Sequence, residues 1–470
     1  MNRSGLSECV LRFTQRLQKE DVNMHGFLLS VRGKKIAEAY YAPFREGQPH
    51  RLYSVSKTFT GIAVGMLADS GSLTLDQHIT DFFQDWLPDN PSPYLLHLTI
   101  SDMLRMSTCY RRTAYREGID SDWARSFFTG SPDHEPGMVF AYDTGCSQVL
   151  AALVRRISGM EVMDYLEEHL FHPLSCQDQR YWLRDPSGCC QGGTGLCMSL
   201  RDLHRIAECL LRGGDGIIPR WYAENMGKKH IDTSLQDKEE ERYGYGWQCW
   251  RTRAGWSLYG MGGQLSILCP DKQTVLSTIA DTRLDPFGVQ RIYNAFFDEI
   301  WPFLPGDGGI PEGTPDQPLI LSLSVPGLKD CPAAGFLGKG CYVFPGSNSL
   351  GLKALTLSDT ELKMSRTTCS VSLPYARGKT LEIPWPGYSD IPALVSAGWI
   401  EDRVLRLRCH AVGNAPCGFD MLISLSKDRI TVQSRCSSDP LTIGYDGIAV
   451  LRVSLNLLIQ LLKELTMTAV

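Results

Sequence analysis

The sequence predicts an α+β fold followed by a smaller all-β region. Between residues 1 and 303, helix-like segments surround consecutive strand-like segments at 243–280, which favours helices packed on an antiparallel sheet. A stretch rich in proline and glycine follows at 304–316, and such a composition is typical of a linker. Beyond it, short segments of alternating polarity dominate, as β-strands do. We therefore expect a first domain at 1–303, a linker at 304–318 and a β-rich domain with a terminal helix at 319–470.

The first elements are a helix and a hairpin. Residues 6–19 predict the helix, and two apolar stretches within 26–41 are joined by a turn at Arg32–Lys35, which predicts the hairpin. A helix then runs from Ser54 to about Gly71. A further helix begins near Thr99, where Thr99 or Ser101 is a suitable cap.

The remaining elements of the first domain are helices followed by strands. A long helix ends at Ser158-Gly159, since glycine is the usual residue after a helix end, and Pro173 ends the helix expected at 163–172. The other segments are a helix at 199–214, strands at 243–250 and 274–280, a stretch at 257–268 that passes through a glycine turn into a further strand, and a closing helix at 289–301. In the second domain we expect strands at 352–357, 361–365, 404–409, 421–425 and 430–434.

The composition excludes several classes of protein. The chain has 470 residues, of which 43% are hydrophobic and 21% charged, an ordinary soluble composition with ample length for a large core. The net charge of −5 and the lack of a Lys/Arg-rich run argue against a nucleic-acid partner. Neither a signal peptide nor an apolar run of the roughly 18 residues that span a bilayer is evident, so we expect a cytoplasmic protein.

Neither the cysteines nor the histidines suggest a metal or disulfide framework. The sixteen cysteines are scattered without a Cys-x-x-Cys pair, and a chain of this length does not need disulfides, so mostly buried thiols are expected. His169 and His172 are close in sequence but lack an accompanying carboxylate-rich motif. We expect no metal and no cofactor.

The stretch Ser54-Val55-Ser56-Lys57 at the start of the second predicted helix carries the strongest chemical signal. Ser54 and Lys57 are three residues apart, which places both on one face of a helix. A neutral lysine amine there can accept the serine proton, and the helix N-terminus favours the developing alkoxide. The chain holds a second copy, Ser424-Leu425-Ser426-Lys427, but the flanking residues predict two strands and a turn, which would not bring the two side chains together.

Further motifs accompany the first copy in a fixed order. They are Leu73-Thr74-Leu75-Asp76, Thr99-Ile100-Ser101-Asp102-Met103-Leu104, Glu135-Pro136-Gly137 with Phe140 and Tyr142, Gly193-x-Gly195-Leu196 with Asp202, and Tyr243-Gly244-Tyr245-Gly246-Trp247. Together with the Ser-x-x-Lys stretch, this set resembles the serine β-lactamase-like superfamily, in its branch of class C β-lactamases, D-alanyl-D-alanine carboxypeptidases and esterases. The resemblance covers about residues 20–303 and implies an antiparallel sheet flanked by helices beside a helical cluster, with the active site between them.

The resemblance also implies roles for single residues. Ser54 matches the nucleophile, Lys57 its proton partner, and Tyr142 the tyrosine of the family's Tyr-x-Asn motif, which relays a proton to the leaving group. This chain has Thr144 in place of the motif's asparagine.

The third family motif departs further. Where relatives have Lys-Thr-Gly or His-Thr-Gly, this chain has Gly260-Met261-Gly262, without the basic residue. The main-chain N–H groups of Ser54 and of Gly263 or Gln264 would then bind the oxyanion.

These observations predict a serine hydrolase that forms an acyl-enzyme on Ser54 and acts on an ester or amide of a small molecule or peptide. It should be a weak β-lactamase, because the third motif lacks the cation that binds a lactam carboxylate. Two alternatives stay open: an acyltransferase that uses the same acyl-enzyme, and a catalytically silent binding protein.

Four aromatic residues are expected in the core rather than in an acyl pocket: Tyr110, Trp123, Tyr245 and Trp247.

Overall fold

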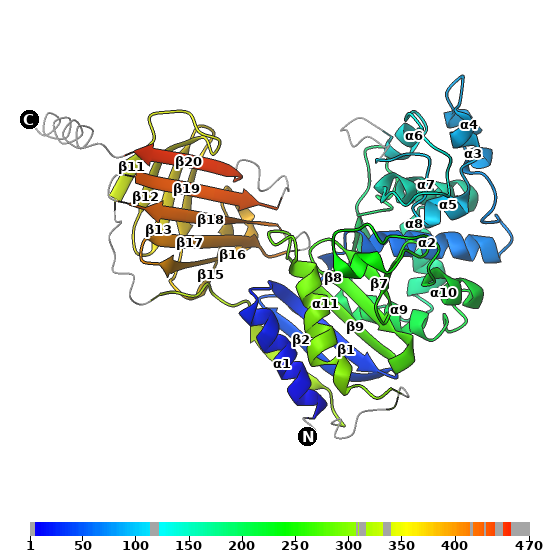
Figure 1. Ribbon diagram of the computed structural model, residues 1–470, viewed down its shortest axis with the longest axis horizontal. Coiled ribbons are helices and arrows are strands. Elements are labelled where there is room, and N and C mark those ends of the chain that lie inside the picture. Colours follow the sequence, from blue (N-terminus) through cyan, green and yellow to red (C-terminus); the bar gives the residue numbers. More distant parts are fainter. Residues whose placement is uncertain are drawn as a thin grey trace, which may run out of the picture. The chain divides into compact units, whose positions relative to one another are not determined.

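The chain forms two compact units, Met1–Ser324 and Val325–Val470. A computed structural model describes residues 5–112, 122–306, 309, 316–331, 340–413, 417–426, 429–437 and 445–452 (Figure 1). We describe each unit by itself.

The first unit is built on a seven-stranded sheet with the order β10-β2-β1-β9-β8-β7-β6. Its strands are β1 (Met24–Val31), β2 (Lys34–Ala42), β6 (Trp250–Thr252), β7 (Gly255–Gly260), β8 (Gln264–Cys269), β9 (Thr274–Ala280) and β10 (Leu319–Ser324). Neighbouring strands are antiparallel except for β10, which pairs with β2 in parallel, from Leu319 opposite Ala37 to Ser324 opposite Ala42. A separate small sheet has the order β3-β5-β4 and consists of β3 (His50–Arg51), β4 (Tyr181–Trp182) and β5 (Leu196–Met198).

Helices cover both faces of the large sheet. On the face toward the viewer in Figure 1, α1 (Leu6–Lys19) packs beside α11 (Gly288–Glu299), whose Tyr293 hydroxyl lies 2.7 Å from the Ser257 hydroxyl of β7. The helix α9 (Leu200–Leu211) packs on β1, β8 and β9. Its buried His204 ring bridges hydroxyl groups of Ser30 and Ser277 at 2.9 Å each.

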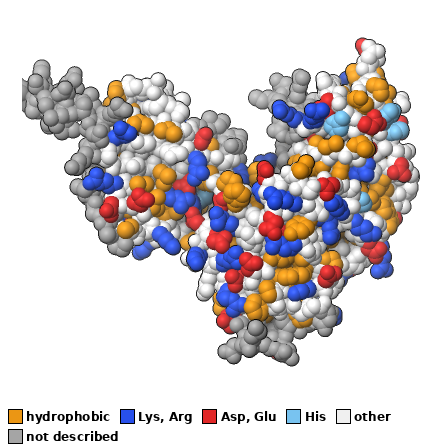
Figure 2. Space-filling model, in the orientation of Figure 1, with side chains coloured by type: hydrophobic (Ala, Val, Ile, Leu, Met, Phe, Trp, Pro, Cys, Tyr) orange, Lys and Arg blue, Asp and Glu red, His pale blue; other side chains and the backbone are white. Residues whose placement is uncertain are grey.

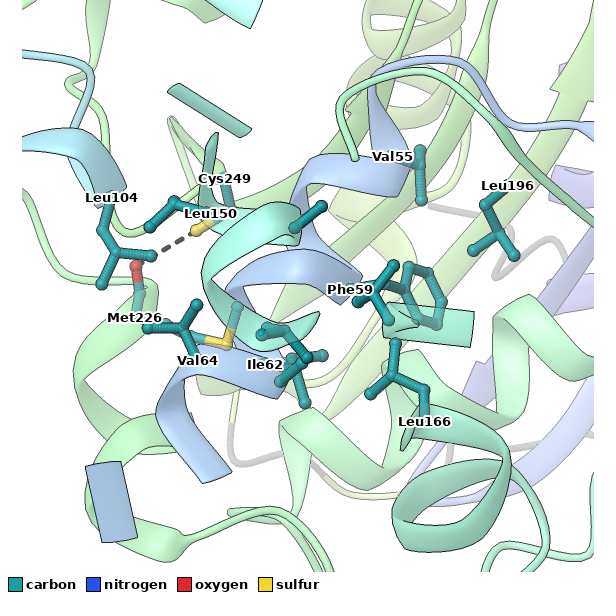
Figure 3. Packing of buried hydrophobic residues seen from close by; sticks show 14 of the residues in the cluster. Val55, Phe59, Ile62, Val64, Leu104, Leu150, Leu166, Leu196, Met226 and Cys249 are labelled. Carbon is teal, nitrogen blue, oxygen red and sulfur yellow. Dashed lines mark hydrogen bonds between the residues drawn. The ribbon is translucent and has the colours of Figure 1, made fainter. Parts of the chain in front are cut away.

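A helical cluster adjoins the sheet. It consists of α2 (Val55–Asp69), α3 (Ile79–Phe82), α4 (Pro93–Leu96), α5 (Ile100–Leu104), α6 (Trp123–Phe127), α7 (Thr144–Ser158), α8 (Val162–Leu166) and α10 (Arg220–Met226). Every residue of α2 from Val55 to Leu67 is buried, as expected for a helix that is apolar all round. Phe59, Ile62 and Val64 pack among apolar side chains of α5, α7 and α8 (Figure 3). The helix that carries the Ser-x-x-Lys stretch is therefore the centre of this core.

The second unit consists of two antiparallel sheets with an apolar core of their residues. The four-stranded sheet has the order β11-β12-β13-β14, with β11 (Gly340–Val343), β12 (Leu352–Leu357), β13 (Glu361–Arg366) and β14 (Ser370–Pro374). The six-stranded sheet runs in chain order through β15 (Thr380–Trp385), β16 (Tyr388–Glu401), β17 (Val404–Ala411), β18 (Gly418–Leu425), β19 (Arg429–Cys436) and β20 (Gly447–Arg452). The strands predicted from alternating polarity are all present.

Most local predictions for the first unit are confirmed, with three differences. Thr99 caps α5 in a capping box with Asp102, and Gly159 ends α7 in a left-handed conformation. Residues 163–172 are not one α-helix, because α8 continues as a π-helical turn at Glu167–Phe171. The strand expected at 243–250 is absent before Trp250, since Gly244 and Gln248 have φ of 113° and 58° and break the extended course.

The boundary between the units is the third difference. Residues 319–324 were expected to open the second domain, but they form β10 at the edge of the first sheet. Their alternating pattern suits either location, and only pairing with β2 decides it. The expected terminal helix lies outside the described residues.

The cysteines and the histidines of the His-x-x-His stretch have local contacts. No cysteine of the sixteen is in a disulfide bond, and most are buried. The His172 ring lies 3.1 Å from the Glu167 carboxylate, and the His169 ring packs against Tyr165. Within the described ranges, no group of three metal-binding side chains occurs and no helix is long and apolar enough to span a membrane.

Candidate active site

Ser54 stands at the N-cap of α2, and Lys57 lies in the first turn of that helix. The Lys57 side-chain nitrogen is 3.1 Å from the Ser54 hydroxyl oxygen, within hydrogen-bond distance. Tyr53, directly before the serine, has a φ of 48°, a left-handed conformation that is costly for a side chain of this size. Such strain is found where a backbone is held for function, and here it precedes the serine main-chain N–H.

Ser424 of the second copy lies on a strand, β18, as predicted, and its side chain is exposed. Lys427 lies outside the described residues.

Lys57 is 1% exposed and held by two acceptors. Besides Ser54, its nitrogen donates to the Gly193 carbonyl oxygen at 2.8 Å. A Cβ atom at Gly193 would lie 3.1 Å from this nitrogen and 2.6 Å from the Thr144 methyl group, so a side chain there would push the lysine aside. Gly193 therefore helps to fix the position of the lysine side chain.

Tyr142 lies next to both residues. The Lys57 nitrogen is 5.1 Å from the centroid of the Tyr142 ring. Burial of the phenol oxygen raises the pKa of Tyr142 above its ordinary value, while a hydrogen bond with the Ser54 side chain lowers it in part. The residue as a whole is 37% exposed because its ring borders a pocket. Its phenol is therefore protonated at neutral pH and able to donate.

Thr144 is close to this group but does not share its hydrogen bonds. It is the first residue of α7, and the side chain of Asp143 caps that helix by accepting from the Gly145 N–H at 2.7 Å. The Thr144 hydroxyl makes no hydrogen bond within the described residues, and its methyl group faces Gly193.

The turn between β7 and β8 forms a further part of the wall of the pocket that Ser54 and Tyr142 line. Met261 and Gly262 line the same pocket as Ser54, and a Cβ at Gly260 would meet the Leu52 carbonyl at 2.3 Å, so this close approach needs glycine. Gln264 is fully buried. Its side-chain amide donates to the Met261 and Ala280 carbonyls at 3.0 and 2.7 Å and accepts from the Ala280 N–H at 3.2 Å. The buried Gln264 side chain thus stabilises the turn, and it is not among the residues that line the pocket.

The pocket has a volume of about 460 Å³, and its charges are paired. The Lys238 ammonium donates to the Glu241 carboxylate at 2.8 Å and to the Tyr259 hydroxyl at 3.1 Å. Arg283 donates to both oxygens of Asp281, at 2.9 and 3.2 Å. Each cation that borders the pocket therefore has a carboxylate of the protein beside it.

The sequence motifs located some wall residues and missed others. Tyr110 and Tyr245 are buried in the core as expected, whereas Trp250, which stacks on Tyr142 with ring centroids 5.7 Å apart, lines the pocket. Lys238, Glu241 and Arg283 follow no motif, and their positions depend on how separate loops meet.

Comparison with known proteins identifies the family. A model of the β-lactamase family matches residues 13–296. The 6-aminohexanoate-dimer hydrolase of Paenarthrobacter ureafaciens is 28% identical over 215 residues, which cover 43% of this chain and 54% of that protein. The chain thus matches about half the length of this relative.

Solved structures share the fold. A penicillin-binding protein homologue from Caulobacter crescentus superimposes with a TM-score of 0.51 and 15% identity over 64% of this chain and 98% of its own. EstCE1, a hydrolase with promiscuous acyltransferase activity, gives a TM-score of 0.51 and 16% identity over 62% and 99% of the two chains. From residue 13 to residue 296, and with the fold and motif order described above, the chain belongs to the β-lactamase family.

Proposed function

We propose that this protein is a serine hydrolase that forms an acyl-enzyme on Ser54 and cleaves an uncharged ester or amide. The observation that carries the proposal is the 3.1 Å contact between the buried Lys57 nitrogen and the Ser54 oxygen at a helix N-terminus, with Tyr142 beside them. The name of the 6-aminohexanoate-dimer hydrolase relative agrees with a hydrolytic activity.

In the proposed acylation, a neutral Lys57 amine accepts the Ser54 proton as the serine oxygen attacks the substrate carbonyl. The bond from carbonyl carbon to leaving group then breaks, and the leaving group takes a proton by way of the Tyr142 phenol. Water attacks the ester on Ser54 in the second half-reaction. Its proton returns through the same groups, which releases the acid and restores the serine.

The oxyanion would lie between main-chain N–H groups of Ser54 and of the β7–β8 turn. The Gly263 N–H already donates to the Gly260 carbonyl at 3.3 Å within the turn. The N–H groups of Met261 and Gly262 donate to no described group, and both residues border the pocket. We therefore place the second donor at Met261 or Gly262 in preference to the expected Gly263 or Gln264.

A covalent probe tests the nucleophile. A fluorophosphonate should add one adduct to the wild-type protein and none to Ser54→Ala, as measured by intact-protein mass spectrometry. Ser424→Ala is the matched control and should label like the wild type, because its serine lies on an exposed strand. An adduct that persists on Ser54→Ala would refute the assignment.

Substrate charge gives a second test. Penicillins and cephalosporins carry a carboxylate, and a charge-assisted hydrogen bond to it contributes roughly 1.5–3 kcal/mol. Because Lys238 and Arg283 are paired with carboxylates, we expect kcat/KM for p-nitrophenyl butyrate to exceed that for nitrocefin by about ten- to a hundred-fold or more. Equal efficiencies would mean that one of these cations leaves its partner to bind the lactam.

A further inference from the structure

Three large apolar side chains are exposed at residues that line the Ser54 pocket or directly adjoin such residues in the chain. Leu235 is 94% exposed, Phe287 58% and Met261 47%. Met261 lines the pocket itself, Leu235 precedes the lining residue Gln236, and Phe287 follows the lining residue Pro286. We call these three side chains the apolar rim. On the face shown in Figure 2, hydrophobic side chains lie in several separate places among charged ones.

Each rim residue projects from a tight, hydrogen-bonded turn. Leu235 is in a turn closed by the Gln236 N–H donating to the Thr233 carbonyl at 3.0 Å. Phe287 caps α11, and its own N–H donates to the Asp285 carboxylate at 2.9 Å. Met261 is in the turn that Gln264 holds. The backbone therefore presents these side chains to solvent, where a polar residue would cost less.

The interior of the pocket is different in character. Next to Ser54 its wall consists of Tyr142, Trp250 and Tyr259, with Lys238 and Glu241 paired beyond them. A substrate would place its reacting carbonyl group here. The part of the substrate that leaves the pocket must then cross the rim.

We propose that the substrate carries an apolar chain of several methylene groups, which lies across the rim while its carbonyl group reaches Ser54. This inference rests on the proposed function and narrows it to medium-chain acyl esters or amides. A chain suits the rim better than a protein does, since three side chains offer far less than the roughly 800 Å² per partner of a stable protein interface. Exposed apolar patches can mark ligand-binding grooves.

The test compares chain lengths. Complete burial of one methylene group raises a binding constant about fourfold. Because the rim is open, we expect kcat/KM for p-nitrophenyl octanoate to exceed kcat/KM for the butyrate about tenfold. In the double variant Leu235→Ser/Phe287→Ser the gain should fall below about twofold, with the butyrate rate unchanged. Leu11→Ser, at a 42% exposed position on α1, is the control and should keep the full gain.

Other outcomes overturn the inference. Octanoate no better than butyrate in the wild type, or an equal gain in the double variant, would refute it while cleavage of butyrate by Ser54 still stands. Binding of the double variant and the wild type can also be compared without turnover, by titrating the apolar fluorophore N-phenyl-1-naphthylamine. If no ester is cleaved, a Kd at least about fivefold weaker in the double variant supports the rim, and an unchanged Kd overturns it. Rim-dependent sedimentation with phosphatidylcholine vesicles, combined with a flat chain-length profile, would assign the rim to a membrane instead.

Discussion

Lys57 combines full burial with two hydrogen-bond acceptors, Ser54 and Gly193, and an aromatic neighbour, Tyr142. The geometry allows one proton path, from serine to lysine and on through the phenol. Lys57→Met and Tyr142→Phe should therefore each lower kcat/KM for p-nitrophenyl butyrate by at least ~10²-fold, the usual effect of losing a general acid or base. The double variant should lose little more than either single one, because both residues serve one path.

Controls separate this effect from misfolding. Lys229→Met removes an exposed lysine that pairs with Asp232, and it should leave turnover unchanged. Near-normal turnover in Lys57→Met or Tyr142→Phe would remove that residue from the mechanism.

His50 makes the stability of the first unit sensitive to acid. The ring is buried, and its Nε2 atom lies 2.9 Å from Nδ1 of His25. Burial lowers the pKa of His50 from 6.5 to about 4. Between these two values the unfolded chain binds more protons than the folded one, so stability falls as the pH drops from 6.5 toward 4. The loss attributable to His50 is about 3 kcal/mol over that window.

The pH dependence of Tm measures this contribution. His50→Gln should flatten the fall in Tm between pH 7 and 4.5, whatever its effect at pH 7. His97→Gln changes an exposed histidine and should keep the wild-type slope. Coinciding slopes for His50→Gln and the wild type would show that His50 is not the titrating group.

The active-site residues divide into those that motifs can locate and those that they cannot. Ser54 and Lys57 are three positions apart on one helix, so local spacing alone brings them together. Tyr142 was found through a family motif, and the structure places it beside them. Glu241, Trp250 and Arg283 come from loops and strand ends whose meeting depends on the tertiary fold, and no local pattern marks them. The conformation of Tyr53 is also invisible in sequence, because tyrosine has no preference for positive φ.

The helix α2 shows how packing overrides helix propensity. Gly61 and Gly65 lie one turn apart within it, although glycine destabilises a helix interior by about 1 kcal/mol relative to alanine. The fully buried Tyr222 of α10 explains both, since a Cβ at Gly65 would lie 2.5 Å from its ring and one at Gly61 2.9 Å from its hydroxyl oxygen. A sequence pattern predicts α2 from its apolar residues but does not predict that the Tyr222 side chain packs against its two glycines.

Gly65→Ala should therefore destabilise the protein despite the better helix propensity of alanine. Overpacking of this kind costs roughly 1–3 kcal/mol, and Tm should fall by about 2–4 °C for each kcal/mol. Tyr222→Leu removes the ring, so the double variant should be less destabilised than the sum of the two single changes. Additive effects in thermal unfolding would show that the ring and the added methyl group do not meet.

Alternating polarity located β12, β13, β17, β18 and β19 of the second unit, and it did not single out β11, β14, β15, β16 or β20. It failed at residues 243–249, where consecutive aromatic and glycine residues suggest a strand but positive φ angles produce turns. It also could not assign β10 to a sheet, since partner choice depends on residues far away in the chain.

The position of β10 changes how the two units should be separated. A fragment that ends at residue 303 lacks β10 and leaves β2 as an unpaired sheet edge, with its hydrogen-bonding groups from Ala37 to Ala42 open. Open edges invite pairing with other chains. A fragment that ends at Ser324, where the compact unit ends, keeps that edge covered.

We therefore expect residues 1–324 to be soluble, monodisperse and active on p-nitrophenyl butyrate without the second unit, because Ser54, Lys57, Gly193 and the residues that line the pocket all lie before residue 290. Residues 1–303 should have a lower Tm and should self-associate, as size-exclusion chromatography and thermal unfolding would measure. We attribute the expected difference to the sheet edge, since both fragments keep α1, α2 and α11. Equal stability and equal monodispersity of the two fragments would show that β10 adds nothing to the sheet, and an insoluble 1–324 fragment would show that the first unit needs the second in order to fold.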